Sequence, residues 1–200
     1  MHVRRCRLVA LLAGVGMLLC ACAAPTVAEL RSRHPYYTPE ANEPDGTQIG
    51  LEEWIGLHDA IVIGTVEDVP ATLVLVETAA DGTTQRVERY GYRLRVSRVL
   101  AGECPDDEVL VWFSVGDLGQ VYLPQKGDVL LCLATPDGDT KVADDAKAPP
   151  VYLAPPLFFV DGGRVLAVYD EERYARCDGL TVDECAEALA AVWQAGHTGD

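Results

Sequence analysis

The residues with the most distinctive chemistry in this 200-residue chain are its seven cysteines. A thiol forms a disulfide, binds a metal ion or carries a covalent group. Four of them, Cys104, Cys132, Cys177 and Cys185, lie beyond the N-terminal region, and no Cys-x-x-Cys spacing favours a zinc site. Cys177 and Cys185 are the most local pair and the candidate disulfide, which would leave Cys104 with Cys132. Buried free thiols are the alternative interpretation.

The other three cysteines lie in or beside an N-terminal secretory pattern. Arg4, Arg5 and Arg7 form a positive segment, and the stretch Leu8–Ala21 that follows is apolar and uncharged. A helix needs about 20 apolar residues to span a bilayer, so this run is too short for a stable anchor. It is typical of the hydrophobic core of a secretory signal.

The sequence Leu19-Cys20-Ala21 directly before Cys22 resembles the bacterial lipobox, which has an aliphatic residue at −3 and a small residue at −1. Cys20 is the poorer candidate, because bulky Leu19 precedes it. The resemblance implies that the Cys22 thiol is joined to diacylglycerol and that the chain is then cut before Cys22. Two acyl chains hold a protein stably on a bilayer, whereas one gives only marginal binding.

Residues 1–21 are therefore predicted to be a lipoprotein signal peptide. The mature protein is expected on the extracytoplasmic face of a bacterial cell membrane, with the bilayer as a partner through Cys22. An ordinary secretory signal cut after Ala24 or Ala28 is the alternative. Residues 22–49 contain four prolines and few aliphatic side chains, which predicts an extended tether.

The charge of the mature chain excludes one class of partner. Without residues 1–21 the chain keeps 13 Lys and Arg against 31 Asp and Glu, a formal net charge of −18. Nucleic-acid binding depends on basic patches that displace counterions from phosphates, so no nucleic-acid partner is expected.

A catalytic or metal-binding motif is not found. Ser114 follows Trp112-Phe113 where a nucleophile elbow needs glycine at −2. His58 on a helix face is expected to be a cap or a half-buried packing residue. Counted from Asp137 as position 1, the acidic loop at 136–147 has Val142 where a calcium loop needs glycine and Ala148 where it needs glutamate. We therefore expect a non-enzyme without cofactor or metal.

The elements that would position these residues are mostly strands. A short helix is predicted near Leu51, and a strand with Gly64 in its middle is predicted over 60–69. Turn sequences at Asp81-Gly82 and at 161–163 predict hairpins. Thr181 and Glu184 form a capping-box pattern at the start of a terminal helix, which Gly196 is expected to end. The remaining strands are predicted at 72–78, 83–102, 108–115, 126–135 and 156–170, the last of these divided by its turn.

Antiparallel strands that bury one face must close or stack. Residues 50–196 are accordingly predicted to form a mainly β domain. We expect a small antiparallel OB-like barrel with a short N-terminal helix and a C-terminal capping helix. A two-sheet β-sandwich is the alternative.

Three stretches together resemble the domains related to tissue inhibitors of metalloproteinases and netrins: DAIVIGTVEDV at 59–69, YGYRLRVSRVLAGE at 90–103 and KGDVLLCLAT at 126–135. Val96, Val99, Leu100 and Gly102 fit the second motif of that superfamily, and Gly127, Asp128 and Leu131 fit the third. The match covers 59–169 and implies the OB fold. The inhibitory chemistry is not implied, because the Cys-x-Cys at the barrel entrance is absent and Cys22 lies more than thirty residues before the first strand.

The expected function is a membrane-anchored binding or interaction module for an unidentified protein, peptide or glycan. Exposed aromatic residues among Tyr36, Tyr37, Tyr122 and Tyr152 are the expected contacts. An enzyme whose site is assembled from dispersed residues, without a motif, is one alternative. A structural component of the cell envelope is the other.

Overall fold

The computed structural model describes residues 24–37, 50–70, 72–113 and 122–197. It contains the helices α2 (Val27–Arg33), α3 (Leu51–Gly56) and α4 (Val182–His197) and a 3-10 turn, η2 (Glu172–Tyr174). The strands are β1 (Ala60–Asp68), β2 (Leu73–Thr78), β3 (Thr84–Gly102), β4 (Glu108–Phe113), β5 (Val129–Pro136), β6 (Thr140–Val142), β7 (Val151–Leu153), β8 (Pro156–Asp161) and β9 (Arg164–Ala167).

Five strands close into a ring in the order β1, β3, β4, β7, β5 and back to β1. Four of the neighbouring pairs are antiparallel, and the β4–β7 pair is parallel. An odd number of strands cannot alternate direction around a closed ring, so one parallel pair is required. The predicted mainly β, OB-like barrel with a short N-terminal and a C-terminal helix is confirmed, and the two-sheet sandwich is not formed.

The ring closes tightly where β1 crosses β3. A Cβ at Gly64 would lie 2.6 Å from Leu94 Cγ and 2.8 Å from the carbonyl oxygen of Arg95, so the strands approach too closely there for a larger residue. The β1–β3 register also shifts between Ile63 and Gly64. Gly64 therefore marks the irregularity in the strand that the sequence predicts.

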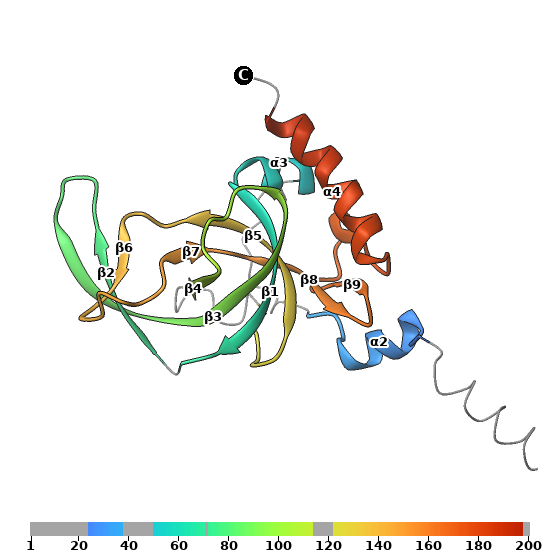
Figure 1. Ribbon diagram of the computed structural model, residues 1–200, viewed down its shortest axis with the longest axis horizontal. Helices are drawn as coiled ribbons and strands as arrows, with labels where there is room; N and C mark the ends of the chain where they lie inside the picture. The colour runs from blue at the N-terminus through green and yellow to red at the C-terminus, as the bar shows by residue number, and fades with distance from the viewer. Residues whose placement is uncertain (1–23, 38–49, 71, 114–121, 198–200) are drawn as a thin grey trace, which may run out of the picture.

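The long strand β3 belongs to two sheets. Its second half is part of the ring, and its first half forms a hairpin with β2, to which β6 adds as an edge strand. Figure 1 shows this β6–β2–β3 hairpin sheet projecting from one side of the molecule. Gly82 in the hairpin turn has a φ of 81°, as the Asp81-Gly82 sequence predicts.

Alternation along β4 divides the apolar side chains between two cores. Val109 and Val111 face the main core inside the ring, while Leu110 and Trp112 face a smaller one. This second core lies between the hairpin sheet and the strands β4 and β7, and its buried members are Leu73, Leu75, Leu110 and Val151. The hairpin sheet is thus fixed to the barrel by burial of apolar side chains.

The terminal helix α4 covers the barrel beside α3 (Figure 1). Thr181 Oγ1 accepts the Glu184 N–H, and the Glu184 carboxylate accepts the Thr181 N–H, so the predicted capping box is present. Cys185, Leu189 and Val192 are buried under α4. The helix extends to His197, one residue beyond the predicted end.

Residues 24–37 are not the extended tether predicted for 22–49. They form α2 and pack on the domain, since Leu30 is 0% exposed and Tyr37 bridges to Tyr169. The side chains of Thr26 and Glu29 make a second capping box that starts the helix. Arg31 pairs with Asp178, and Arg33 and His34 both pair with Asp161. We call residues 24–37 the docked segment. Residues 22–23 and 38–49 lie outside the described residues.

Among the described helices, none has the length and apolar character needed to cross a membrane.

Candidate functional site

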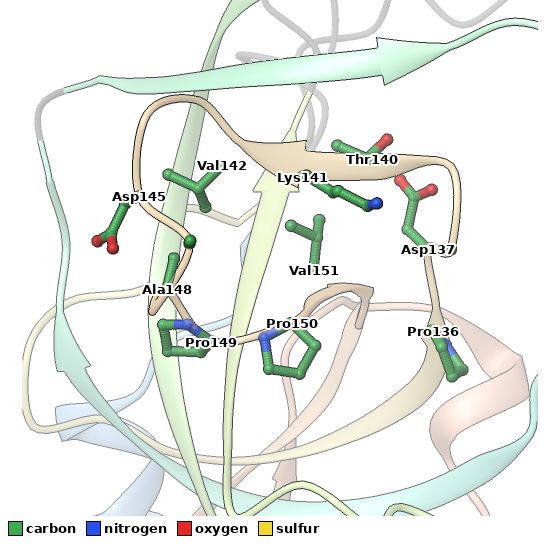
Figure 2. Close-up of a pocket in the computed structure, with 12 residues that line it drawn as sticks. Pro136, Asp137, Thr140, Lys141, Val142, Asp145, Ala148, Pro149, Pro150 and Val151 are labelled. Atoms are coloured by element: carbon green, nitrogen blue, oxygen red, sulfur yellow. The ribbon is translucent and has the colours of Figure 1, made fainter. Parts of the chain in front are cut away.

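A pocket of about 350 Å³ opens between β6 and β7, at the end of β5. The loop from β5 to β7 forms most of its wall; the lining residues are Pro136, Asp137, Gly138, Thr140, Lys141, Val142, Asp145, Ala146, Ala148, Pro149, Pro150 and Val151. In Figure 2, β6 crosses above the pocket, Pro149 and Pro150 lie below it, and Val151 lies between. The volume is in the range of small-ligand sites.

The apolar wall of the pocket is continuous with the second core. Val151 belongs to that core, and Val142 and Ala148 pack against it. Pro149 and Pro150 hold the chain extended as it enters β7, because each proline ring fixes its φ near −65°. The wall is therefore held by packing and by restricted backbone.

Asp137 is fixed on one side of the pocket. Its Oδ2 accepts a hydrogen bond of 3.0 Å from the Trp112 indole N–H. The guanidinium of Arg89 lies 5.2 Å from the Trp112 ring centroid and is itself paired with Glu77 at 2.6 Å. These contacts link the pocket to the hairpin sheet and set the orientation of the carboxylate.

Asp145 and Lys141 supply the other charged groups of the lining. The Asp145 carboxylate accepts the Lys147 N–H at 3.0 Å, which shapes the turn below the pocket. The exposed Lys141 ammonium has no ion-pair partner within the described part of the chain. The pocket thus offers two carboxylates, one amine and an apolar wall, a set suited to apolar contact, hydrogen bonding and charge pairing.

A second hollow of about 230 Å³ lies beside the docked segment and is lined by Tyr36, Ala167, Tyr169, Asp170, Glu171, Glu172, Ala175 and Asp178. Its central carboxylate is already engaged. Asp178 pairs with Arg31 and accepts the Tyr36 hydroxyl at 2.8 Å and the Ala167 N–H at 2.8 Å. These bonds hold the docked segment on the barrel, so we assign this hollow a structural role.

The predicted lipid attachment site, Cys22, lies outside the described residues. Cys177 and Cys185 lie together in the main core as free thiols, both 0% exposed. The hydrogen bond between them lowers the pKa of Cys177 and raises that of Cys185. Burial raises the pKa of Cys132 to about 12, and Cys104 is half-buried elsewhere. The disulfide between Cys177 and Cys185 stays a prediction.

His58 takes the packing role that its position predicts. It is half-buried, and its Nδ1 lies 2.9 Å from the carbonyl oxygen of Trp54, one helical turn earlier. Burial lowers the pKa of His58 below its ordinary value. Among the described residues, no group of three or more His, Cys, Asp or Glu side chains is placed to hold a metal ion.

Exposed contact residues are expected among four tyrosines, and of these four only Tyr36 is exposed. Tyr152 is 1% exposed and donates a hydrogen bond to Asp106, and half-buried Tyr122 donates one to Asp128. Tyr37 is half-buried against Tyr169. Tyr36 is exposed, but its ring packs against the Arg31 guanidinium. Their hydroxyl and ring contacts stabilise the domain.

The sequence does not predict this pocket, because the loop at 136–147 fails the calcium-loop pattern and contains no other binding motif. Asp144 of that loop points instead to Arg86, which lies 2.6 Å away on the hairpin and lowers the pKa of Asp144. The adjacent prolines Pro149 and Pro150, which favour extended chain, were the available signal in the sequence. None of the protein-family models, curated proteins or solved structures compared with the chain matches it.

Proposed function

We propose that this protein is a lipid-anchored, extracytoplasmic, non-catalytic binding module. Cys22 is the attachment site of the lipid, and the pocket between β6 and β7 is the ligand site. The observation that carries the proposal is the position of the pocket in the strand ring. It lies beside the loop that joins the fourth ring strand, β5, to the fifth, β7.

OB-like barrels characteristically bind ligands on the second and third strands and on two loops, between strands one and two and between strands four and five. Here the hairpin sheet occupies the first of those connections, and β6 occupies the second. Both contribute to the second core that supports the pocket. The charge of −18 over residues 22–200 disfavours nucleic acid and leaves protein, peptide or glycan ligands.

The chemistry of the lining supports binding over catalysis. The described residues of the lining include no serine, cysteine or histidine; Asp137 is engaged by the Trp112 indole, and Asp145 accepts the Lys147 N–H. A general base would need a free carboxylate within reach of a nucleophile or a water held by a second group.

On-cell photo-crosslinking tests the ligand site. A photoreactive benzophenone residue replaces Lys141 in one variant and Lys126 in the other. Lys126 is the matched control, because it is exposed in the turn before β5, at the opposite end of that strand from the pocket. Capture at position 141 and not at position 126 is expected. Equal capture of a partner at both positions would overturn the proposal. Capture at neither position, when the photoreactive residue is efficiently incorporated into the membrane-anchored protein, would also overturn it.

The anchor is tested separately by growth with labelled palmitate. The wild-type chain is expected to incorporate label and to partition with membranes, and Cys22→Ser is expected to lose both properties. Label retained in Cys22→Ser would contradict the assignment of Cys22.

A further inference from the structure

The strand β6 is the free edge of the hairpin sheet. In the part of the chain that the structure describes, it pairs with β2 alone, through the register Leu75↔Val142, Val76↔Lys141 and Glu77↔Thr140. Hydrogen bonds from Thr78 N–H to the Asp139 carbonyl and from Ala143 N–H to the Val74 carbonyl flank this register. In an antiparallel pair the bonded positions alternate, so Lys141 is the bonded residue opposite Val76.

The backbone groups of Thr140 and Val142 consequently point away from β2, toward the open edge. The Thr140 N–H donates a hydrogen bond to the Asp137 carbonyl oxygen, with an N···O distance of 3.3 Å. Within the described residues, the Thr140 carbonyl and the N–H and carbonyl of Val142 have no backbone partner. Three groups in donor and acceptor alternation are thus available for pairing with another chain.

The pocket lies along this edge. Figure 2 shows β6 above, Pro149 and Pro150 below and Val151 between them, with Asp137 at one end and Asp145 at the other. A strand added to a sheet lies about 4.8 Å from its neighbour, and its alternate side chains point to one face. One face of a strand added to β6 would meet the apolar wall formed by Val142, Ala148 and Val151.

The charged groups around the pocket determine which kind of extended peptide is favoured as a ligand. Asp137 and Asp145 flank the edge and Asp139 precedes it, so three carboxylates outnumber the one ammonium of the lining, that of Lys141, and the chain from residue 22 onward carries −18. A basic segment is attracted by this field, and an acidic one is repelled.

We infer that the pocket binds an extended basic peptide segment, which adds as a strand to the edge of β6. This inference rests on the proposed binding function and names the ligand class of the same site. Backbone hydrogen bonds to β6 supply affinity for any extended peptide. Alternate apolar side chains of the peptide pack against the apolar wall and supply specificity.

The probe is the capped pentapeptide acetyl-Val-Lys-Val-Arg-Val-amide with a fluorescent label, and binding to the full-length chain in detergent micelles is followed by anisotropy. Two further probes carry N-methyl groups, one on residues two and four and the other on residues three and five. Strand addition uses only one of these two sets of N–H groups. One N-methylated probe is therefore expected to bind roughly tenfold more weakly and the other to bind nearly as well as the parent.

Two variants test the protein side of the pairing. Val142→Pro removes the N–H at the open edge and no bond to β2, whereas Val142→Ala shortens the same side chain and keeps the N–H. Weaker binding by Val142→Pro than by Val142→Ala, roughly tenfold, is expected. Trp112 fluorescence, with Trp54 and Trp193 as common background, monitors the second core in both variants. If Val142→Pro does not fold, the pair of N-methylated probes decides the question on the wild-type chain.

The result that would overturn strand addition is equal binding of both N-methylated probes, or binding of the acidic peptide acetyl-Val-Glu-Val-Glu-Val-amide as tight as that of the basic one. Absence of peptide binding, together with crosslinking at position 141, would reject the peptide inference and leave the binding module in place. Absence of both would reject the two proposals together.

Discussion

Replacement of Leu30 by alanine tests whether residues 24–37 are part of the folded domain. Leu30 is 0% exposed and belongs to the main core. A Cβ at Gly162 would lie 3.3 Å from Leu30 Cδ2, so the leucine lies directly under the β8–β9 turn. Leucine-to-alanine changes at buried sites cost about 2–5 kcal/mol of unfolding free energy. The seven-residue helix α2 lies on the outside of the barrel and is able to collapse partly, so we expect about 2–3 kcal/mol.

Urea unfolding followed by circular dichroism measures this loss as a shift of the midpoint at an unchanged slope. Trypsin cleavage after Arg31 and Arg33 gives a local readout, because both side chains are held in ion pairs while the segment is docked. The matched control is Val27→Ala. Val27 lies on the same helix and is 38% exposed, so its replacement is expected to change stability by less than about 0.5 kcal/mol.

The reasoning would be refuted if Leu30→Ala behaved like Val27→Ala in both measurements. A lower unfolding free energy indicates that α2 is part of the cooperative core. An unchanged midpoint with faster cleavage of Leu30→Ala indicates that Leu30 holds the segment on a barrel that is stable without it. Either result places Leu30 in the docking contact, and only the absence of both excludes it.

Three other predictions concern the barrel and its thiols. A Cβ at Gly64 would lie 2.6 Å from a leucine side chain, so Gly64→Ala is expected to cost about 1–3 kcal/mol in thermal unfolding. The control Gly138→Ala, which has open space around it, should change little, and similar losses in the two variants would contradict the argument. Burial lowers the pKa of His58 in the folded state, so its stabilising contribution is present above pH ~6.5 and is lost as the pH falls. Unfolding free energies between pH 7.5 and 5.5 should therefore decline less in His58→Gln than in the wild type, and parallel curves would count against this. Oxidation by a small-molecule disulfide during refolding is expected to join Cys177 to Cys185, remove two hydrogen atoms from the mass and add about 2–3 kcal/mol. If Cys177 and Cys185 of the oxidised protein both react with an alkylating reagent after denaturation without reductant, that bridge is excluded.

The features that could be predicted from the sequence are those encoded locally. Gly82 at the tip of the β2–β3 hairpin and Gly162 and Gly163 between β8 and β9 all have positive φ, and their turn sequences identify them without tertiary information. The capping box of Thr181 and Glu184 likewise depends on four consecutive residues. Half-buried antiparallel strands must either close or stack, so the strand pattern favoured a ring and left the two-sheet sandwich as the alternative.

The docked segment carried a similar local signal that its surroundings concealed. Thr26 and Glu29 repeat the spacing of the C-terminal capping box, yet four prolines within residues 22–49 favoured extended chain. Leu30 is the only buried residue of α2, so the sequence contains no apolar stripe from which this helix could be predicted. Its position depends on ion pairs with Asp161 and Asp178, which are more than 120 residues away in the sequence.

The pocket could not be predicted because it exists only in the assembled ring. β6 and β7 have three residues each, too few for alternation to identify a strand. β7 is held by a parallel pairing with β4 and an antiparallel pairing with β5, both of which depend on ring closure. The distance from β6 to β7, and hence the pocket between them, is set by the second core beneath them.

The docked segment also determines how the domain would stand on a membrane. With Cys22 lipidated as proposed, Ala24 is two residues from the bilayer attachment point, which an extended backbone spans in ~7 Å. An extended tether over the 28 residues 22–49 would have allowed the barrel to move tens of ångströms away from the lipid headgroups. Instead α2 and β9 would rest near the lipid surface. Figure 1 places the hairpin sheet at the other end of the long axis, so β6 would face outward, away from the membrane. The folded barrel itself would then be the spacer between the membrane and the ligand pocket. The short linker at 22–23 would limit how far the domain tilts on the membrane.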